Sequence, residues 1–402
     1  MERYQKLIID YAQKEYAKML REPDGILQYK FLVPGAGYKN SLWDWDSWLT
    51  NIALADIVHG RDIAEYEKGC ILNFLSHVDE EGRMPIYITP KAAFPNFTEE
   101  KTNIHKPVLA QHAVFICERI KDYDWLKEYF SVMEKYLVYY DMHCKHESGL
   151  YFWIDDCAIG VDNDPCTYYR PKGSSASIYL NCLMYQEILA MQTLANAFGD
   201  AEKAKIYEQK ANELKTAVRE NCWDERDGFY YSVDINLLPV DKTQALHYGA
   251  PRHWSCLIQR IGVWSGFMAM WAGIATKEQA ERMVKNHYAD ERTFNAPYGV
   301  RTLSKMEKMY SIKATNNPSC WLGPIWGISN YMTFEGLRKY GYSEEAKGLA
   351  LKTIRLFGED LEKTGELHEY YHPETGEGLY NAGFQNWNLL VVKMVHFLDS
   401  CN

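Results

Sequence analysis

Residues 343–357 read SEEAKGLALKTIRLF, and this stretch decides the fold class. Its apolar and small side chains recur at i, i+3, i+4, i+7, i+8 and i+11, the pattern of one helix face. They are Ala346, Leu349, Ala350, Thr353, Ile354 and Phe357. Ser343 and the glutamates after it suit a helix start, because a serine can cap free amides and negative charge is favourable there. The stretch therefore predicts a long amphipathic helix that begins at residue 343.

The same helical period recurs along the whole chain, in roughly twelve segments. They begin near residues 2, 44, 62, 107, 123, 174, 200, 259, 276, 322, 343 and 384. Long, irregular stretches rich in Gly, Pro, Asp, Asn and Trp lie between some of them, at residues 21–43, 78–106, 144–173, 223–255, 289–321 and 361–383. A long stretch recurs about every 60–70 residues, the length of two helices with their connections. This rhythm favours an all-α fold, an (α/α)6 barrel of six helical hairpins with the long loops at one end.

Composition and charge exclude several classes of protein. The net charge is −10 without a basic run, so we expect no nucleic-acid partner, which would need clustered Lys and Arg. No apolar stretch reaches about 18 residues, so we expect no membrane span. The charged N-terminus lacks a signal peptide's apolar core, and the 10 cysteines show no zinc-like spacing. We expect a cytoplasmic protein of one domain (residues 1–402), with reduced cysteines and without a metal or cofactor; its oligomeric state is left open.

The first long loop ends in residues 42–48, LWDWDSW, with three tryptophans and two aspartates. One interpretation is structural: Asp46 or Ser47 caps the next helix and the tryptophans fill the core. We favour a sugar subsite, because caps do not require tryptophan. An indole ring can stack on a sugar, and a carboxylate can accept hydrogen bonds from its hydroxyls. The high aromatic content of the chain, 14%, is compatible with either interpretation.

Two further loops carry carboxylates among Gly, Pro and aromatic residues. Residues 153–165 read WIDDCAIGVDNDP, and residues 367–376 read LHEYYHPETG. Hydrolysis of a glycoside needs two carboxyl groups, one to protonate the leaving oxygen and one to activate water or attack directly. The two loops would meet at one end of a barrel. Acidic loop residues are common on solvated surfaces, so the pattern alone is not specific.

Five short motifs, taken in order, resemble those of the glycoside hydrolases of family 63 and the trehalases, and most of all the mannosylglycerate and glucosylglycerate hydrolases. They are residues 43–46 (WDWD), 82–85 (GRMP), 160–165 (GVDNDP), 321–326 (WLGPIW) and 369–376 (EYYHPETG). The resemblance implies an (α/α)6 barrel and an inverting mechanism without a cofactor. It also implies Asp162 as the general acid and Glu369 as the general base. The expected substrate is a small α-linked glucoside or mannoside, either a disaccharide or a glycosylated small molecule.

The expected sugar-binding residues surround this acid/base pair. They are Trp43, Trp45, Asp46, Tyr87, Trp321, Trp326, Tyr370, Tyr371, Gln385 and Trp387. For Trp321, Trp326, Tyr370, Tyr371 and Gln385, packing in the core explains the residue type about as well. The chain departs from the family pattern at Leu322, at residues 157–159 (CAI) and at His105 with Lys106. We expect these positions to shape the pocket and its leaving-group side.

Three other functions remain open. A sugar epimerase on the same barrel would use histidine bases, for which His105, His253 and His368 are candidates. A non-catalytic sugar-binding protein would have no need of both carboxylates. A helical scaffold would not require Trp, Asp and Gly-Pro motifs concentrated in its loops.

Overall fold

The computed structural model describes residues 1–58, 63–97, 101–237, 254–315 and 317–401. Twelve α-helices lie in these ranges. They are α1 (Glu2–Glu15), α2 (Asp44–Leu54), α3 (Ala64–Leu75), α4 (Leu109–Ile120), α5 (Phe130–His143), α6 (Ile178–Ala197), α7 (Ala201–Cys222), α8 (Met268–Trp271), α9 (Lys277–Met283), α10 (Gly327–Lys339), α11 (Ser343–Thr364) and α12 (Val391–Ser400). The fold class predicted from the helical period is confirmed.

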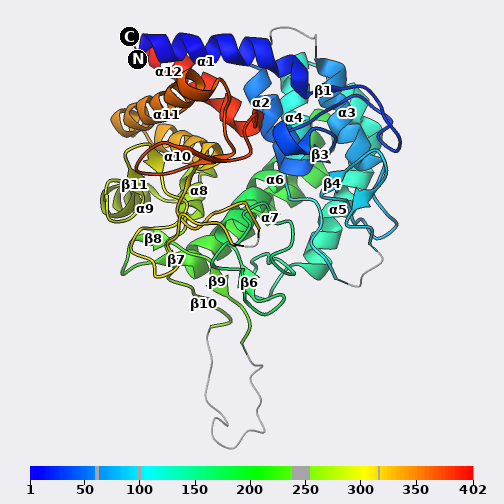
Figure 1. The fold of residues 1–402 in the computed structure, drawn as a ribbon. Coiled ribbons are helices and arrows are strands. Elements are labelled where there is room, and N and C mark those ends of the chain that lie inside the picture. Colours follow the sequence, from blue (N-terminus) through cyan, green and yellow to red (C-terminus); the bar gives the residue numbers. More distant parts are fainter. Residues whose placement is uncertain (59–62, 98–100, 238–253, 316, 402) are drawn as a thin grey trace, which may run out of the picture.

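The helices form an (α/α)6 barrel (Figure 1). Its inner ring follows the even-numbered helices: α2 contacts α4, and the contacts continue through α6, α8 and α10. The 3-10 turn Asn386–Leu390, which leads into α12, contacts both α10 and α2 and closes the ring. Helices α3, α7 and α11 pack outside against α4, α6 and α10. Figure 1 shows the two chain ends together, where α1 contacts α11 and α12.

The inner helix α2 is buried on nearly all sides, whereas the outer helix α11 is buried on one side. In α2 every residue from Asp44 to Leu54 except Ile52 is buried, as expected for a helix enclosed on all sides. In α11 the buried side includes all six positions of the predicted apolar face. The glutamates after Ser343 lie in the first turn as predicted, but the serine cap is wrong. Ser343 is already the first helical residue, and Tyr342 precedes the helix without a side-chain cap.

The long loops are less irregular than the sequence suggests, because short antiparallel strands tie them together. Three of these sheets have three strands: β3 (Leu42–Trp43), β4 (Tyr87–Ile88) and β5 (Ala93–Phe94); β6 (Ser175–Ala176), β9 (Val233–Asp234) and β10 (Leu257–Ile258); β13 (Ile325–Trp326), β14 (Tyr370–Tyr371) and β15 (Gly378–Tyr380). The two-stranded sheets are β1 (Leu20–Arg21) with β2 (Phe31–Leu32), β7 (Trp223–Asp224) with β8 (Phe229–Tyr230), and β11 (Asn295–Ala296) with β12 (Gly299–Val300). Each three-stranded sheet joins two long loops that are consecutive in the sequence.

Several predicted helices begin later than expected. The segment predicted from residue 259 follows strand β10 and turns helical only at Trp264, as a 3-10 turn before α8. The segments predicted from residues 174 and 322 become helical only after strands β6 and β13, at Ile178 and Gly327. The segment predicted from residue 384 begins with a 3-10 turn, before α12. In the first case the pairing of β10 with β9, continued by a hydrogen bond from the Gln259 amide to the Ser232 carbonyl, holds the chain extended, and the helical period does not reveal this tertiary constraint.

The interior is continuous across the barrel. Buried apolar side chains form one connected cluster that runs from Ile8 to Leu398. No disulfide joins any of the ten cysteines, all of which lie in the described residues, and eight of them are buried. Within the described part of the chain, no helix combines the length and the apolar character that crossing a bilayer requires.

Candidate active site

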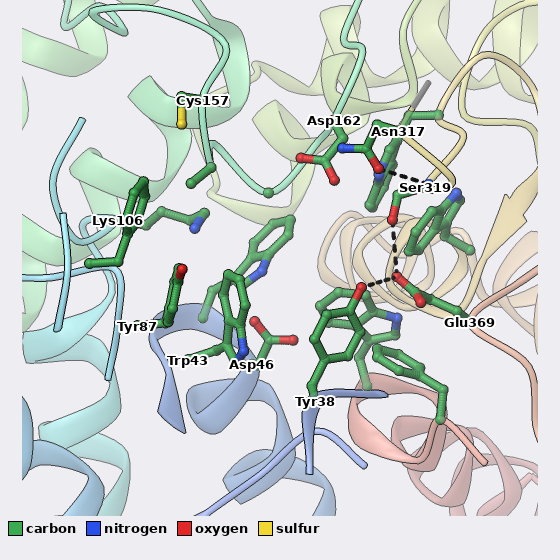
Figure 2. Close-up of a pocket in the computed structure, with 18 residues that line it drawn as sticks. Tyr38, Trp43, Asp46, Tyr87, Lys106, Cys157, Asp162, Asn317, Ser319 and Glu369 are labelled. Carbon is green, nitrogen blue, oxygen red and sulfur yellow. Dashed lines mark hydrogen bonds between the residues drawn. The ribbon is translucent and has the colours of Figure 1, made fainter. Parts of the chain in front are cut away.

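A cavity of about 300 Å³ lies where five of the six long loops meet (Figure 2). Its walls are mainly aromatic, and three carboxyl groups and one amine face it. The lining residues are Tyr38, Trp43, Trp45, Asp46, Tyr87, Phe94, Lys106, Cys157, Ala158, Gly160, Asp162, Asn317, Ser319, Trp321, Trp326, Glu369, Phe384 and Trp387. An apolar cavity with a few convergent polar groups is the usual form of a small-molecule site.

The structure brings most of the predicted site residues together here. Nine of them line the cavity: Asp162, Glu369, Trp43, Trp45, Asp46, Tyr87, Trp321, Trp326 and Trp387. In Figure 2, Asp162 and Glu369 project from different walls, and Asp46 lies below them. Two loops that are about 200 residues apart in sequence thus supply the two carboxyls, as a barrel with its long loops at one end predicts.

Three predicted sugar-binding residues do not line this cavity, and their side chains make contacts within the protein. The Tyr370 hydroxyl donates to the carbonyl of Pro318 at 2.6 Å. The Tyr371 hydroxyl is buried and donates to the Asp360 carboxylate at 3.0 Å. Gln385 packs so tightly against Gly35 that a Cβ there would lie 2.0 Å from its Oε1. All three support the walls of the cavity from behind.

Two aspartates in the first turn of α2 have different surroundings: Asp44 is bound within the protein, and Asp46 faces the cavity. The buried Asp44 carboxylate accepts the Trp45 amide at 2.7 Å and the Lys106 ammonium at 3.0 and 3.1 Å. Asp46, two residues further along the same turn, receives a hydrogen bond from Asn386 and points into the cavity. Burial, with a contribution from the charge of Asp44, raises the pKa of Asp46 to about 8. Asp46 is therefore mainly protonated at neutral pH and can both donate and accept hydrogen bonds.

Glu369 lies directly before β14, held by three donors. The hydroxyls of Tyr38 and Ser319 each donate to its Oε1 at 3.3 Å, and the Asn381 amide donates to Oε2 at 2.8 Å. Its side chain is almost fully buried, and this burial raises its pKa to about 7. The hydrogen bonds oppose that rise, and the nearby Asp162 adds to it. A carboxyl with this pKa exchanges protons near neutral pH, as a general base requires.

Asp162 is held by the backbone of its own loop. Gly160 before it takes a φ of +89°, which an L-residue rarely adopts. Asn163 after it accepts the Trp321 amide at 3.0 Å, which joins the acid loop to residues 321–326. Burial raises the pKa of Asp162, and the charge of Asp156 adds to the rise, whereas Asn317 and Lys106 oppose it. A raised pKa is the property that a general acid needs.

The aromatic walls also carry unused hydrogen-bond donors. The indole N–H groups of Trp43, Trp321 and Trp387 are buried and have no hydrogen-bond partner among the described residues. Buried donors are normally satisfied, and an unsatisfied one at a cavity wall is available to a ligand or to water. Three such donors beside aromatic faces suit a ligand with many hydroxyls.

The sequence interpretation missed several cavity residues. They are Tyr38, Phe94, Asn317, Ser319 and Phe384. Tyr38 and Phe384 each lie within a few residues of a recognised motif, which was the available signal. Lys106, at a position expected to shape the pocket, does line the cavity, but its pairing with Asp44 across 62 positions left no trace in the sequence pattern.

The departures from the family pattern have mixed outcomes. Cys157 and Ala158 line the cavity as expected. Leu322 and His105 do not line it. His105 is buried between α3 and α5, and its Nδ1 lies 2.6 Å from the Lys106 carbonyl. Burial lowers its pKa to about 4.

The histidines required by the epimerase alternative are also absent from the described cavity wall. His368 pairs with Asp360 at 2.9 Å, away from the cavity. His253 lies outside the described residues. Neither described candidate, His105 or His368, is placed to act as a base on a sugar in this cavity.

A helical barrel that holds paired carboxyls in an aromatic cavity at its loop end defines a glycosidase. Residues 38–388 match the model of the mannosylglycerate hydrolase MGH1-like glycoside hydrolase domain, and the chain belongs to this family. It is 22% identical to the mannosylglycerate hydrolase MGH1 of Selaginella moellendorffii, over 92% of this chain and 82% of that protein. It is 24% identical to a cytosolic neutral trehalase of Pyricularia oryzae, over 81% of this chain and 50% of that protein.

The fold has a close counterpart among solved structures. The family 63 mannosylglycerate hydrolase of Thermus thermophilus, solved in complex with glucose, superposes with a TM-score of 0.69 at 18% identity. The match covers 98% of this chain and 99% of that one. The resemblance inferred from the five motifs is confirmed, and the protein is a glycosidase of this type.

Proposed function

We propose that the protein is an inverting glycoside hydrolase that cleaves small α-linked glucosides or mannosides, with Asp162 as general acid and Glu369 as general base. The observation that carries this proposal is the pair of carboxyls on different walls of one aromatic cavity, each with a raised pKa. The family relationship supports hydrolysis, and the relatives' names indicate glycosylglycerates or trehalose as substrate types.

In the proposed reaction the sugar occupies the cavity between the two carboxyls. Glu369 removes a proton from a water molecule, and the water oxygen bonds to the anomeric carbon. On the opposite face of the ring the bond from that carbon to the glycosidic oxygen breaks. Asp162 gives its proton to the departing oxygen. The cycle needs no cofactor, and the two carboxyls return to their starting states by exchanging protons with water.

The other residues would bind and orient the ring. Trp43, Trp45 and Trp387 supply apolar faces, and their placement supports stacking against the sugar. Protonated Asp46 and the free indole N–H groups would pair with hydroxyls. Tyr38 and Ser319 are positioning residues, since each holds Oε1 of Glu369.

A cytoplasmic location is part of the proposal. It is supported by the lack of disulfides among the described residues and by the cytosolic trehalases among the relatives. A periplasmic trehalase is also similar to the chain, at 22% identity, so fractionation of the native cells is the direct check.

The test is a hydrolysis screen over α-glucosides, α-mannosides and α-galactosides with small aglycones. Asp162→Asn and Glu369→Gln should each lower kcat by about 10²–10⁴-fold while the circular dichroism spectrum stays unchanged. Glu377→Gln is the matched control, because it changes a neighbouring, exposed carboxyl outside the cavity. Activity close to wild type in either cavity variant would refute its role.

A further inference from the structure

A second cavity adjoins the first on the side away from the proposed base. It has a volume of about 490 Å³, within the usual range for small-ligand sites of about 300–1,000 Å³. Tyr87, Phe94 and Cys157 line both cavities. Figure 2 shows Tyr87 and Cys157 across the site from Glu369. In an inverting hydrolase the leaving group departs on the face opposite the base, so the second cavity lies where an aglycone would be.

A row of stacked rings connects the two cavities. Register across β3, β4 and β5 pairs Trp43 with Tyr87 and Tyr87 with Phe94. The ring centroids are 4.3 Å apart in the first pair and 5.1 Å apart in the second, with interplanar angles of 26° and 18°. The row is a continuous apolar wall, and cross-strand pairing keeps it in place.

The opposite wall of the second cavity is also fixed. Asn103 donates to the Asp155 carbonyl at 2.9 Å and to the Cys157 carbonyl at 2.8 Å. Asp155 in turn accepts the Cys157 amide at 3.0 Å. The hydroxyls of Tyr87 and Thr102 also line this cavity and can exchange hydrogen bonds with a polyol, whereas the Thr89 hydroxyl is used within its own turn, where it donates to the Ala92 carbonyl at 2.9 Å.

The charges along this path disfavour an acidic ligand. The charged side chains that line the two cavities, within the part of the chain that the structure describes, are Asp46, Asp162, Glu369, Asp155 and Lys106. Lys106 is the single cation among them. Its ammonium is only 1% exposed and lies 3.0 Å from the Asp44 carboxylate, so its charge is already matched. Asp155 pairs with the exposed Lys172 at 3.2 Å, and Lys172 does not line either cavity.

We propose that the second cavity is a leaving-group subsite for a neutral, hydroxylated aglycone of the size of a sugar ring, and that it rejects an aglycone carrying a carboxylate. This inference rests on the proposed function and adds the chemistry of the aglycone. A carboxylate there would lie beside the Asp155 carboxylate and would find no unpaired cation among the described lining residues, whereas a sugar or polyol would meet an apolar wall and hydrogen-bonding side chains. The subsite thus separates neutral glycosides from glycosylglycerates.

The first test compares substrates that differ in one charged group. Glucosylglycerol and glucosylglycerate, with the corresponding mannosides, share glycone and linkage, and glucosyl fluoride reports cleavage without an aglycone. We expect kcat/KM for the glycerol glycoside to exceed that for the glycerate glycoside by about tenfold or more, a difference of about 1.4 kcal/mol. Equal values, or a preference for the glycerate, would overturn the inference and leave the proposed hydrolase intact.

The second test uses a larger side chain to reduce the space in the second cavity. Ala92 is an exposed residue that lines only the second cavity, and Lys91 beside it lines neither. Ala92→Trp should lower kcat/KM for a neutral disaccharide about tenfold more than for glucosyl fluoride, and Lys91→Trp should not separate the two substrates. An equal effect of Ala92→Trp on both substrates would count against the subsite. Absence of turnover with every substrate would overturn the proposed function, and this inference with it.

Discussion

Replacing Glu369 by glutamine should stabilise the protein at neutral and alkaline pH while it removes the proposed base. The reason is the burial of the carboxyl, which raises its pKa from 4.5 to about 7. A carboxyl whose pKa is higher in the folded state binds more protons there than in the unfolded chain. Stability therefore falls as pH rises from 4.5 through 7, and the full cost is present above that range. Glutamine is neutral at every pH and does not bear this cost.

The magnitude follows from the difference between the two pKa values. Each pH unit between them is worth about 1.4 kcal/mol, so the ionised form costs about 3 kcal/mol when the side chain is buried. Glutamine can keep the surrounding hydrogen bonds. Its carbonyl can accept from Asn381, and the hydroxyls of Tyr38 and Ser319 can turn to accept from its amide.

The assay is urea unfolding of wild type and Glu369→Gln at several pH values. The variant should gain about 3 kcal/mol over wild type above about pH 8, and the two proteins should be nearly equal below about pH 4. Glu377→Gln is the matched control, because Glu377 is exposed in the same hairpin and should change stability by less than about 0.5 kcal/mol. A variant that is less stable than wild type at alkaline pH, or a difference independent of pH, would refute the reasoning.

Three other expectations concern residues that line the cavity. Tyr38→Phe removes a hydrogen-bond donor that favours the ionised form of Glu369, so the pKa of Glu369 should rise. The ascending limb of the pH profile of kcat/KM should therefore move to higher pH, and an unchanged profile would contradict this expectation. Lys106→Met leaves the buried Asp44 without its partner and should lower the free energy of unfolding by about 3–5 kcal/mol, whereas the double change with Asp44→Asn should recover part of the loss. Gly160→Ala should destabilise by about 1 kcal/mol or more in urea unfolding, because φ is +89° and the new Cβ would lie 2.8 Å from Cε of Lys106; a neutral effect would show that the acid loop can relax.

The sequence was sufficient to predict whatever depends on local periodicity. The apolar positions of residues 343–357 form the buried side of α11, and the recurrence of long loops correctly predicts a barrel with its site at one end. The motifs identified the family and seven predicted residues that line the cavity, and Tyr87 and Trp387, predicted outside the motifs, line it too. These features repeat within one helix, or lie within a few residues of one another.

The features that were missed depend on partners far away in the chain. Tyr371 follows a motif glutamate, but its hydroxyl binds Asp360 on α11, so it lies in the core. Lys106 reaches the site only because Asp44 holds its ammonium. The helix expected from residue 259 yields to pairing with β9. Tertiary contacts determine where these side chains lie and where this helix starts. Residue propensity and motif spacing carry no information about such contacts.

The central claim is that Glu369 directs water to the face opposite the departing group while Asp162 protonates that group. The most direct measurement is a proton NMR time course of the sugar first released from an α-glycoside that the protein cleaves. The account predicts that the β-anomer forms first and the α-anomer appears only by mutarotation. Initial release of the α-anomer would show retention of configuration and would contradict the assignment of Glu369 as a base acting through water.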